Sequence, residues 1–303
     1  MTTADDPMYV TISLDIDPDA NSAVEGRHDA LSSPVKEEAI RVDACKMGLL
    51  KILELLDAHD VAATLFYEAR TAQMLEADGM DLPALSERHE VACHSLKHED
   101  FLGKVSGMPM EEDAIEKTAS EAVEILKNMF GRTVKGFRAP YTRINHAVVR
   151  VLERMGFMYD SSETMPLGNG WTGNPFPLKT FGSKLMELAL PSFPDANGKM
   201  MSSYLWAIFE GRRGYQEYTD AVLRAQEVAR NGLFVFSIHP WHLYVNSRGV
   251  PFSTEQARQN VENLERIFSS LKRMDGIEIV RQDEYMEWWL NRSNGAMTKT
   301  IVG

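Results

Sequence analysis

Two pairs of residues have spacings that point both of their side chains in one direction. Asp15 and Asp17 stand two residues apart in YVTISLDIDPDA, and His94 and His98 stand four residues apart in HEVACHSLKHED. Residues two apart share one face of a strand, and residues four apart share one face of a helical turn. Two imidazoles and a carboxylate that meet at one point form a three-ligand metal site with a position left open for water. The sequence therefore predicts a metal-dependent hydrolase in which the second carboxylate takes a proton from that water.

The predicted metal ligands are Asp17, His94 and His98, and the predicted general base is Asp15. Zn²⁺ suits two imidazoles and a carboxylate best, although Co, Mn and Ni ions bind the same kinds of ligand. A divalent cation keeps a neighbouring carboxylate charged, so that Asp15 can accept a proton from water that the metal acidifies. Two alternatives stay open: Asp15 and Asp17 could exchange roles, or Asp17 and the two histidines could be ordinary solvated groups.

Arg138, in the segment GFRAPY, is predicted to pair with Asp15. A guanidinium orients a carboxylate through two parallel hydrogen bonds. The alternative is a surface arginine at the end of a strand. Pro140 fixes the turn that follows, and the backbone N–H of Tyr141 is a candidate donor to the oxyanion of the reaction. Pro140 and Tyr141 are therefore predicted to lie at the substrate.

His239, in FVFSIHPWH, is the predicted general acid that donates a proton to the leaving nitrogen. An imidazole carries such a proton near neutral pH. The alternative is a core histidine that is hydrogen-bonded to the backbone. Asp160 is predicted to hold His239 in orientation, and Trp241 with His242 is predicted to line the pocket. Further pocket candidates, for which packing or plain exposure is the common alternative, are His28, Trp171 and Trp206.

Alternating strands and helices explain how these residues come together. Apolar strands are predicted at 9–14, 61–67, 90–93, 134–138, 157–160, 233–238 and 277–280. Helices are predicted at 36–58, 70–88 with a break, 111–130, 144–155, 215–230 and 254–273. Each candidate from Asp15 to His239 follows a strand, and working residues of α/β barrels collect at the C-terminal ends of strands. The pattern predicts an α/β protein, a (β/α) barrel with eight strands or fewer.

The remaining segments are predicted to be additions to one catalytic domain that spans residues 1–303. Residues 19–35 are polar and form a loop that could reach over the site. Residues 162–203 contain many Gly and Pro and lack the apolar periodicity of a separate core, so they form a loop-rich insertion. Residues 293–303 are predicted to be a loosely ordered tail.

Composition excludes several classes of function. The net charge of −12 repels phosphate backbones, so we expect no nucleic-acid partner. Neither a basic run nor an apolar stretch of about 20 residues is present, so we expect no membrane partner. The two cysteines make no disulfide framework, and the first residues do not resemble a signal peptide, so we expect a cytoplasmic protein. The expected partner is a small molecule or an amino sugar, and a homo-oligomer is compatible with the sequence.

Taken in order along the chain, these motifs resemble the polysaccharide deacetylase (NodB-homology, carbohydrate esterase) family. The matching elements are Asp15 with Asp17, the run His94-Ser95-Leu96-Lys97-His98, Arg138-Ala139-Pro140-Tyr141, Asp160 and His239. The resemblance covers roughly residues 9–290. It implies a distorted (β/α) barrel of about seven strands and an Asp-His-His metal site. It also implies that Asp15 is the base, Arg138 its tether and His239 the acid in hydrolysis of a non-peptide C–N bond, typically of an N-acetyl group.

Three departures from the family pattern leave the substrate open. The first motif is Asp15-Ile16-Asp17 rather than D-D-G, Ser237 replaces a Leu that packs the acetyl methyl group, and Pro and Trp follow His239. These changes resemble a branch with peptidoglycan-deacetylase-like proteins, cyclic imide hydrolases and allantoinase-like enzymes. Two functions therefore remain: removal of N-acetyl groups from an amino sugar, or opening of small cyclic amides such as imides and ureides. A non-catalytic carbohydrate-binding barrel would lack a ligand, the base or the acid, and none is missing.

Overall fold

A curled sheet of mostly parallel strands runs through the centre of this computed structural model, which describes residues 7–18, 26, 28, 36–168, 173–195 and 197–300. The strand order is β11-β1-β2-β3-β4-β5-β8-β7, with β12 also paired to β1, and only β7 with β8 is antiparallel. The strands are β1 (Met8–Ile16), β2 (Thr64–Tyr67), β3 (Glu90–Cys93), β4 (Gly136–Phe137), β5 (Tyr159–Asp160), β7 (Phe176–Pro177), β8 (Met186–Glu187), β11 (Leu233–Ile238) and β12 (Ile277–Ile279). The predicted α/β barrel is confirmed, as a distorted and open one.

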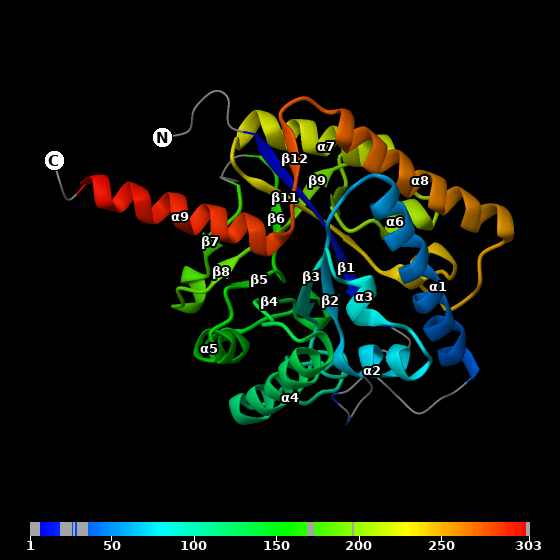
Figure 1. Cartoon of the computed structure of the whole chain (residues 1–303), viewed down its shortest axis with the longest axis horizontal. Helices are drawn as coiled ribbons and strands as arrows, with labels where there is room; N and C mark the ends of the chain where they lie inside the picture. The colour runs from blue at the N-terminus through cyan, green and yellow to red at the C-terminus, as the bar shows by residue number, and fades with distance from the viewer. Residues whose placement is uncertain are drawn as a thin grey trace.

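Helices surround these strands, and α9 extends away from them (Figure 1). The helices are α1 (Lys36–Ala58), α2 (Ala69–Ala77), α3 (Leu82–Leu85), α4 (Glu112–Phe130), α5 (His146–Met155), α6 (Trp206–Phe209), α7 (Tyr215–Val228), α8 (Thr254–Arg273) and α9 (Gln282–Thr300), with 3₁₀ turns η1 (Pro140–Thr142), η2 (Lys179–Phe181) and η3 (Pro240–Leu243). Capping residues determine where several of these helices begin or end. Gly131 and Gly156 adopt the left-handed conformation that ends α4 and α5, and Asn145 accepts a hydrogen bond from Val148 N at the start of α5. In the part of the chain that is described, each helix is too short or too polar to cross a bilayer.

Strand β1 is buried along its whole length, and its two faces have different surroundings. Ile12 and Leu14 pack with their even-numbered neighbours against the helices in the main hydrophobic core, whereas Tyr9 belongs to a smaller cluster inside the barrel. Burying each large apolar side chain contributes about 1.5–3 kcal/mol to stability. Because side chains alternate along a strand, Asp15 lies on the same inner face as Tyr9.

The register of the parallel strands explains why the functional motifs meet. One row of paired residues crosses the sheet through Ile16, Tyr67, Cys93 and Phe137. The residues that follow this row on β1, β3 and β4 are Asp17, His94 and Arg138. These three residues therefore lie at the same height along the strands. On the other edge of β1, Leu14 pairs with Ile238, which brings His239 level with Asp15.

Residues 162–203 contain more regular structure than the predicted insertion of loops. Strands β7 and β8 extend the main sheet, and β6 (Thr164–Pro166), β9 (Leu190–Pro194) and β10 (Met200–Ser202) form a second sheet in the order β10-β9-β6. Each of these strands is five residues or shorter, too short for a clear alternation. The chain then runs beside β11, where Tyr204 forms a parallel bridge with Ser237. The single-domain division remains a prediction.

Two other predictions concern the segments 293–303 and 19–35. The prediction of a loosely ordered tail is wrong for residues 293–300, whose backbone continues α9, while 301–303 lie outside the described residues. Ser293, Asn294 and Gly295 have low helix propensity, which explains the error. The predicted loop at 19–35 lies outside the described residues except for Gly26 and His28. His28 Nε2 lies 2.6 Å from Met108 O, and His28 is not part of the pocket lining described below.

Helix α1 approaches the turn after β11 unusually closely. A Cβ atom at Gly48 would lie 1.9 Å from Pro240 O, closer than real Cβ atoms come to any heavy atom. Only glycine fits this contact, and the contact supports the turn that follows His239.

Candidate metal centre and active site

Three side chains that can hold a metal ion meet at the C-terminal ends of β1 and β3. Each of Asp17, His94 and His98 offers one ligand atom, and these atoms lie within 4.8 Å of one another. All three side chains are buried, and His94 Nε2 lies 3.5 Å from Asp17 Oδ2. The structure thus brings the three predicted ligands together, while their role as ligands remains a prediction.

The two histidines meet through an irregular turn, and the predicted helical turn is wrong. Ser95 and His98 both have positive φ, 68° and 56°. Such conformations cost non-glycine residues of order 1–3 kcal/mol and persist only where the surroundings enforce them. The carboxylate of Glu99 enforces this one, because it accepts hydrogen bonds from Ser95 Oγ and, at 3.3 Å, from Leu96 N. The H-x-x-x-H spacing predicted the meeting of the rings but not the backbone that produces it.

The chemistry of this donor set fits a divalent cation. His94 Nδ1 lies 2.9 Å from Arg138 O, so Nδ1 carries the proton and Nε2 presents its lone pair toward Asp17. Burial lowers the pKa of His94, and it lowers the pKa of His98 well below its usual value. Neutral imidazoles and one carboxylate are the ligands that Zn²⁺ and similar ions prefer.

The predicted pairing of Arg138 with Asp15 is present. Arg138 Nη1 donates to Asp15 Oδ1 at 2.6 Å, and it also reaches Ser13 Oγ at 2.9 Å and Ser237 Oγ at 2.8 Å. The guanidinium is completely buried and lies over the ring of Phe66, 4.1 Å from its centroid. Burial alone would raise the pKa of Asp15, but the charge of Arg138 outweighs it with help from nearby histidines, and the pKa falls to about 2. Asp15 is therefore a charged carboxylate at neutral pH.

His239 lies between this carboxylate and the candidate metal centre. Its Nε2 atom is 3.7 Å from Asp17 Oδ2, and its ring stacks on Trp241 with 5.2 Å between centroids. Burial lowers the pKa of His239 to about 3, so the ring is neutral at neutral pH. The general-acid role remains a prediction, and it requires that the ring gain a proton during the reaction.

The partner of His239 is Tyr204, and the predicted contact with Asp160 is wrong. Tyr204 Oη lies 2.8 Å from His239 Nε2 and 2.9 Å from Asp15 Oδ2. Sequence reasoning missed Tyr204 because it follows no apolar strand; the only signal was its place in an aromatic segment, SSYLW. Asp160 is buried elsewhere, where its Oδ1 accepts a 2.8 Å hydrogen bond from Ser162 Oγ.

Asp160 instead lies opposite Glu187 in the pairing of β5 with β8, and both carboxyl groups are buried. Burial raises the pKa of Asp160 to about 6. Burial and the charge of Asp160 raise the pKa of Glu187 well above its usual value. The pair therefore holds a proton at neutral pH. Ser162 Oγ, which donates to Asp160, also accepts from Ala139 N at 2.8 Å and so links the pair to the turn after Arg138.

The buried pair of Asp160 and Glu187 should make the free energy of unfolding depend on pH. The folded state binds more protons than the unfolded state between the ordinary pKa values near 4 and the raised values of about 6 and above. The free energy of unfolding should therefore fall as pH rises through that window. In Glu187→Gln one of the two groups no longer titrates, so we expect a smaller fall of the free energy of unfolding over this window. Urea unfolding at pH 5 and pH 8 measures the difference.

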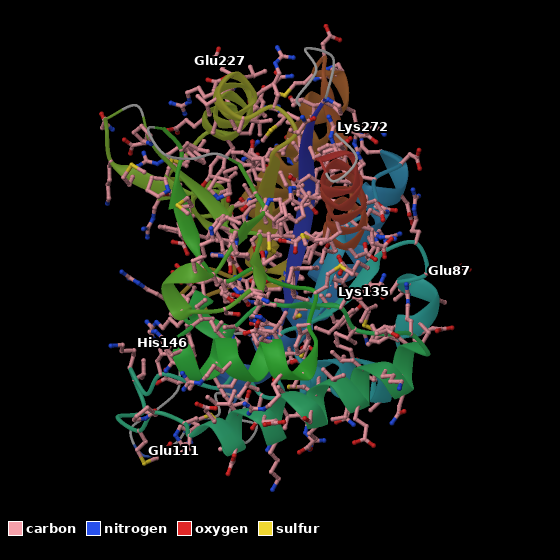
Figure 2. The ribbon with its side chains drawn as sticks, turned by 90° about the vertical axis from the view of Figure 1, so that its left-hand side faces the viewer. Glu87, Glu111, Lys135, His146, Glu227 and Lys272 are labelled. Carbon is pink, nitrogen blue, oxygen red and sulfur yellow. The ribbon has the colours of Figure 1, made fainter. Side chains whose placement is uncertain are left out.

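The matched control is Glu227→Gln, which changes an exposed carboxylate on α7 that lies at the periphery of the molecule (Figure 2). This control should show the same pH dependence as the unchanged protein. Equal pH dependence in Glu187→Gln and the unchanged protein would contradict the shared proton.

A pocket of about 390 Å³ opens over these groups. Its lining is mostly aromatic and imidazole, and it consists of Asp15, His94, His98, Tyr141, Thr142, Tyr204, Trp206, Arg212, His239, Trp241, His242 and Ser247. Among the predicted substrate residues, Tyr141 and Trp241 line the pocket, and the ring of Tyr141 packs edge-on against His98. Pro140 is buried in the turn behind the lining. Trp171 lies outside the described residues.

Part of this chain is similar to a family model and to curated proteins. The family model described as Polysaccharide deacetylase matches residues 39–159, which include His94, His98 and Arg138. The peptidoglycan deacetylase-like protein FGM2 of Gibberella zeae is 27% identical over 156 residues, 50% of this chain and 44% of that protein. The peptidoglycan deacetylase of Helicobacter pylori is 24% identical over 153 residues, 50% of this chain and 49% of that protein. The chain thus matches about half the length of these curated relatives.

Two crystal structures share the fold over nearly the whole chain. A Mycobacterium smegmatis protein assigned to the polysaccharide deacetylases has a TM-score of 0.68 at 17% identity, covering 97% of this chain and 93% of its own. PuuE allantoinase has a TM-score of 0.64 at 17% identity, covering 94% of this chain and 91% of its own. At these identities the likeness concerns the fold alone.

Proposed function

We propose that this chain, whose residues 39–159 match the family model described as Polysaccharide deacetylase, is a metal-dependent amide hydrolase that removes the N-acetyl group of an amino sugar. One observation carries the proposal. Two imidazoles and a carboxylate converge at one end of a pocket whose wall also contains an arginine-held carboxylate and a further imidazole. A base, an acid and a cation site around one pocket are the parts that amide hydrolysis by water requires.

The cation would be held by Asp17, His94 and His98, and Zn²⁺ or another first-row divalent ion suits them. When bound, such an ion acidifies water and stabilises the negative charge that develops on a carbonyl oxygen. The chain itself orients these ligands, since the Nδ1 atom of His94 is engaged by the Arg138 carbonyl.

Asp15 acts as the general base in this proposal. Its carboxylate is charged at neutral pH and is held by Arg138, so one oxygen is turned toward the pocket. Asp15 accepts a proton while the water oxygen bonds to the amide carbon. The C–N bond then breaks, and His239 passes to the leaving nitrogen a proton that its ring takes up from solvent, while Asp15 returns its own proton to solvent. Negative charge that develops beside His239 favours its protonated form. The products are acetate and a free amine.

The pocket suits one ring better than a polymer. A volume of about 390 Å³ is near the lower end of the range of roughly 300–1,000 Å³ for ligand pockets. Tyr141, Trp206 and Trp241 offer aromatic faces to a ring. We therefore propose that the reacting unit is a single acetylated sugar ring.

A second candidate, ring opening of a small cyclic amide, is favoured by Ser237. This side chain is completely buried, and its Oγ accepts from Arg138 Nη1 at 2.8 Å and lies 3.4 Å from Asp15 Oδ2. It therefore belongs to the polar network behind the base and offers no apolar contact for an acetyl methyl group. An imide or ureide ring carries no such methyl group.

A hydrolysis screen separates the two candidates. The metal-loaded protein is incubated with N-acetylglucosamine, short chitin oligomers, succinimide and hydantoin, and the products are identified by mass. Loss of an acetyl group supports the deacetylase, and addition of water to a ring without loss of a fragment supports the cyclic amide hydrolase. No product from any of the four compounds would contradict both.

The cellular location is a separate proposal. Cys45 and Cys93 are free and buried, as is usual for thiols in a reducing compartment. We propose that the protein acts in the cytoplasm, and cell fractionation with an antibody against the chain tests this. Recovery with the secreted or envelope fraction would contradict it.

A further inference from the structure

We propose that Tyr204 is a positioning residue that holds the base Asp15 and the imidazole of His239 in register for hydrolysis. The proposal rests on the proposed function, in which these two side chains move protons. It begins from one atom: Tyr204 Oη lies 2.9 Å from Asp15 Oδ2, 2.9 Å from His239 Nδ1 and 2.8 Å from His239 Nε2. In the described part of the chain, this hydroxyl is the only group with hydrogen-bond contacts to both side chains.

The direction of these hydrogen bonds follows from the groups involved. The hydroxyl of Tyr204 donates its single proton to Asp15 Oδ2, since a carboxylate oxygen accepts. The oxygen of Tyr204 also lies within hydrogen-bond distance of both ring nitrogens of His239. One hydroxyl therefore links the imidazole of His239 to the carboxylate of Asp15.

Both oxygens of the base are therefore held, each from a different direction. Arg138 Nη1 occupies Oδ1 at 2.6 Å, and Tyr204 Oη occupies Oδ2. Hydrogen bonds to a charged acceptor are shorter and about twice as strong as those between neutral groups. With both contacts in place the carboxylate cannot rotate about its last bond. Without Tyr204, Oδ2 would keep only the longer contact with Ser237 Oγ at 3.4 Å.

The backbone of Tyr204 is fixed to the strand that delivers His239. Tyr204 and Ser237 form a parallel β-bridge, and Leu205 N donates to Ser237 O at 2.9 Å. Tyr218 Oη donates to the carbonyl oxygen of Tyr204 at 3.2 Å. The ring of Tyr204 also packs against the His239 ring with 4.9 Å between centroids. The phenol thus has the same rigid support as the imidazole that it contacts, which is what a positioning residue needs.

A purely structural tyrosine would have different partners. Tyr67 and Tyr159 are such residues: both are completely buried, and their hydroxyls contact Ser86 and Glu90, which are not part of the pocket lining. Tyr204 is only partly buried and lines the pocket, and every side-chain partner of its hydroxyl belongs to the proposed catalytic groups.

The test is Tyr204→Phe in the metal-loaded protein, which removes one oxygen and keeps the ring. We expect kcat to fall roughly 10- to 100-fold, since one hydrogen bond to a charged group is lost. KM should stay within about twofold, and the metal content should not change. The matched control, Tyr215→Phe, removes a hydroxyl at the start of α7 outside the pocket lining and should leave both constants unchanged.

A second measurement does not depend on activity. With ¹⁵N-labelled histidine, NMR should show a His239 ring proton that is protected from exchange with water, and Tyr204→Phe should remove that protection. Unchanged kcat in Tyr204→Phe, a change in KM alone, or an unprotected His239 ring proton would each overturn the proposal. If the unchanged protein hydrolyses none of the screened amides, the proposed function fails, and the NMR result alone decides whether Tyr204 holds His239.

Discussion

Replacing Asp15 with Asn is expected to lower kcat by about 10²–10⁴-fold while the bound metal is retained. The amide has nearly the same shape as the carboxylate but cannot accept a proton from water. Arg138 would keep its contacts with Ser13, Ser161 and Ser237 but would lose its only ionic partner among the described residues. A buried charge that loses its partner costs about 3–5 kcal/mol. Thermal unfolding must therefore be measured beside turnover and metal content.

The matched control for Asp15→Asn is Asp17→Asn. Asp17 is the carboxylate closest to the two ligand histidines, so its amide variant should lose metal as well as activity. Metal analysis of both purified variants separates the two roles. Loss of metal from Asp15→Asn with retention in Asp17→Asn would mean that the base and the ligand are exchanged.

Removal of the metal should lower the rate of hydrolysis at least as much as Asp15→Asn does. Chelation followed by gel filtration is expected to lower hydrolysis by more than about 10³-fold, since the ion contributes several kcal/mol of charge stabilisation. One equivalent of Zn²⁺ or Co²⁺ should restore activity. His98→Ala should give the same loss without chelation, because it removes one of the three ligand atoms that lie within 4.8 Å of one another.

His146→Ala is the matched control for the ligand variant. His146 is an exposed histidine at the start of α5, labelled in Figure 2, and it lies outside the pocket lining. Its replacement should leave metal content and rate unchanged. Full activity after thorough metal removal, or a full metal content in His98→Ala, would end the metal-dependent mechanism.

The sequence alone determined the parts of this protein that depend on local pattern. The apolar runs before Asp15, His94 and His239 predicted strands β1, β3 and β11, and the glycines at 131 and 156 marked the ends of α4 and α5. Parallel strands in a barrel have their C-terminal ends on one side. The residues that follow these strands are therefore expected to lie close together. For this reason Asp17, His94 and His98 could be named together, and so could Asp15 with Arg138.

Tertiary structure decided the parts that depend on contacts between distant segments. The hydroxyl of Tyr204 reaches Asp15 across 189 positions of sequence, and no spacing rule spans that distance. Asp160 was expected beside His239, but the register of β5 with β8 pairs it with Glu187, far along the sheet from β11. The turn through Ser95 and His98 depends on Glu99 as a hydrogen-bond acceptor. Local patterns determine which residues leave the sheet at its active end, whereas the packing of short, irregular segments determines which of them touch.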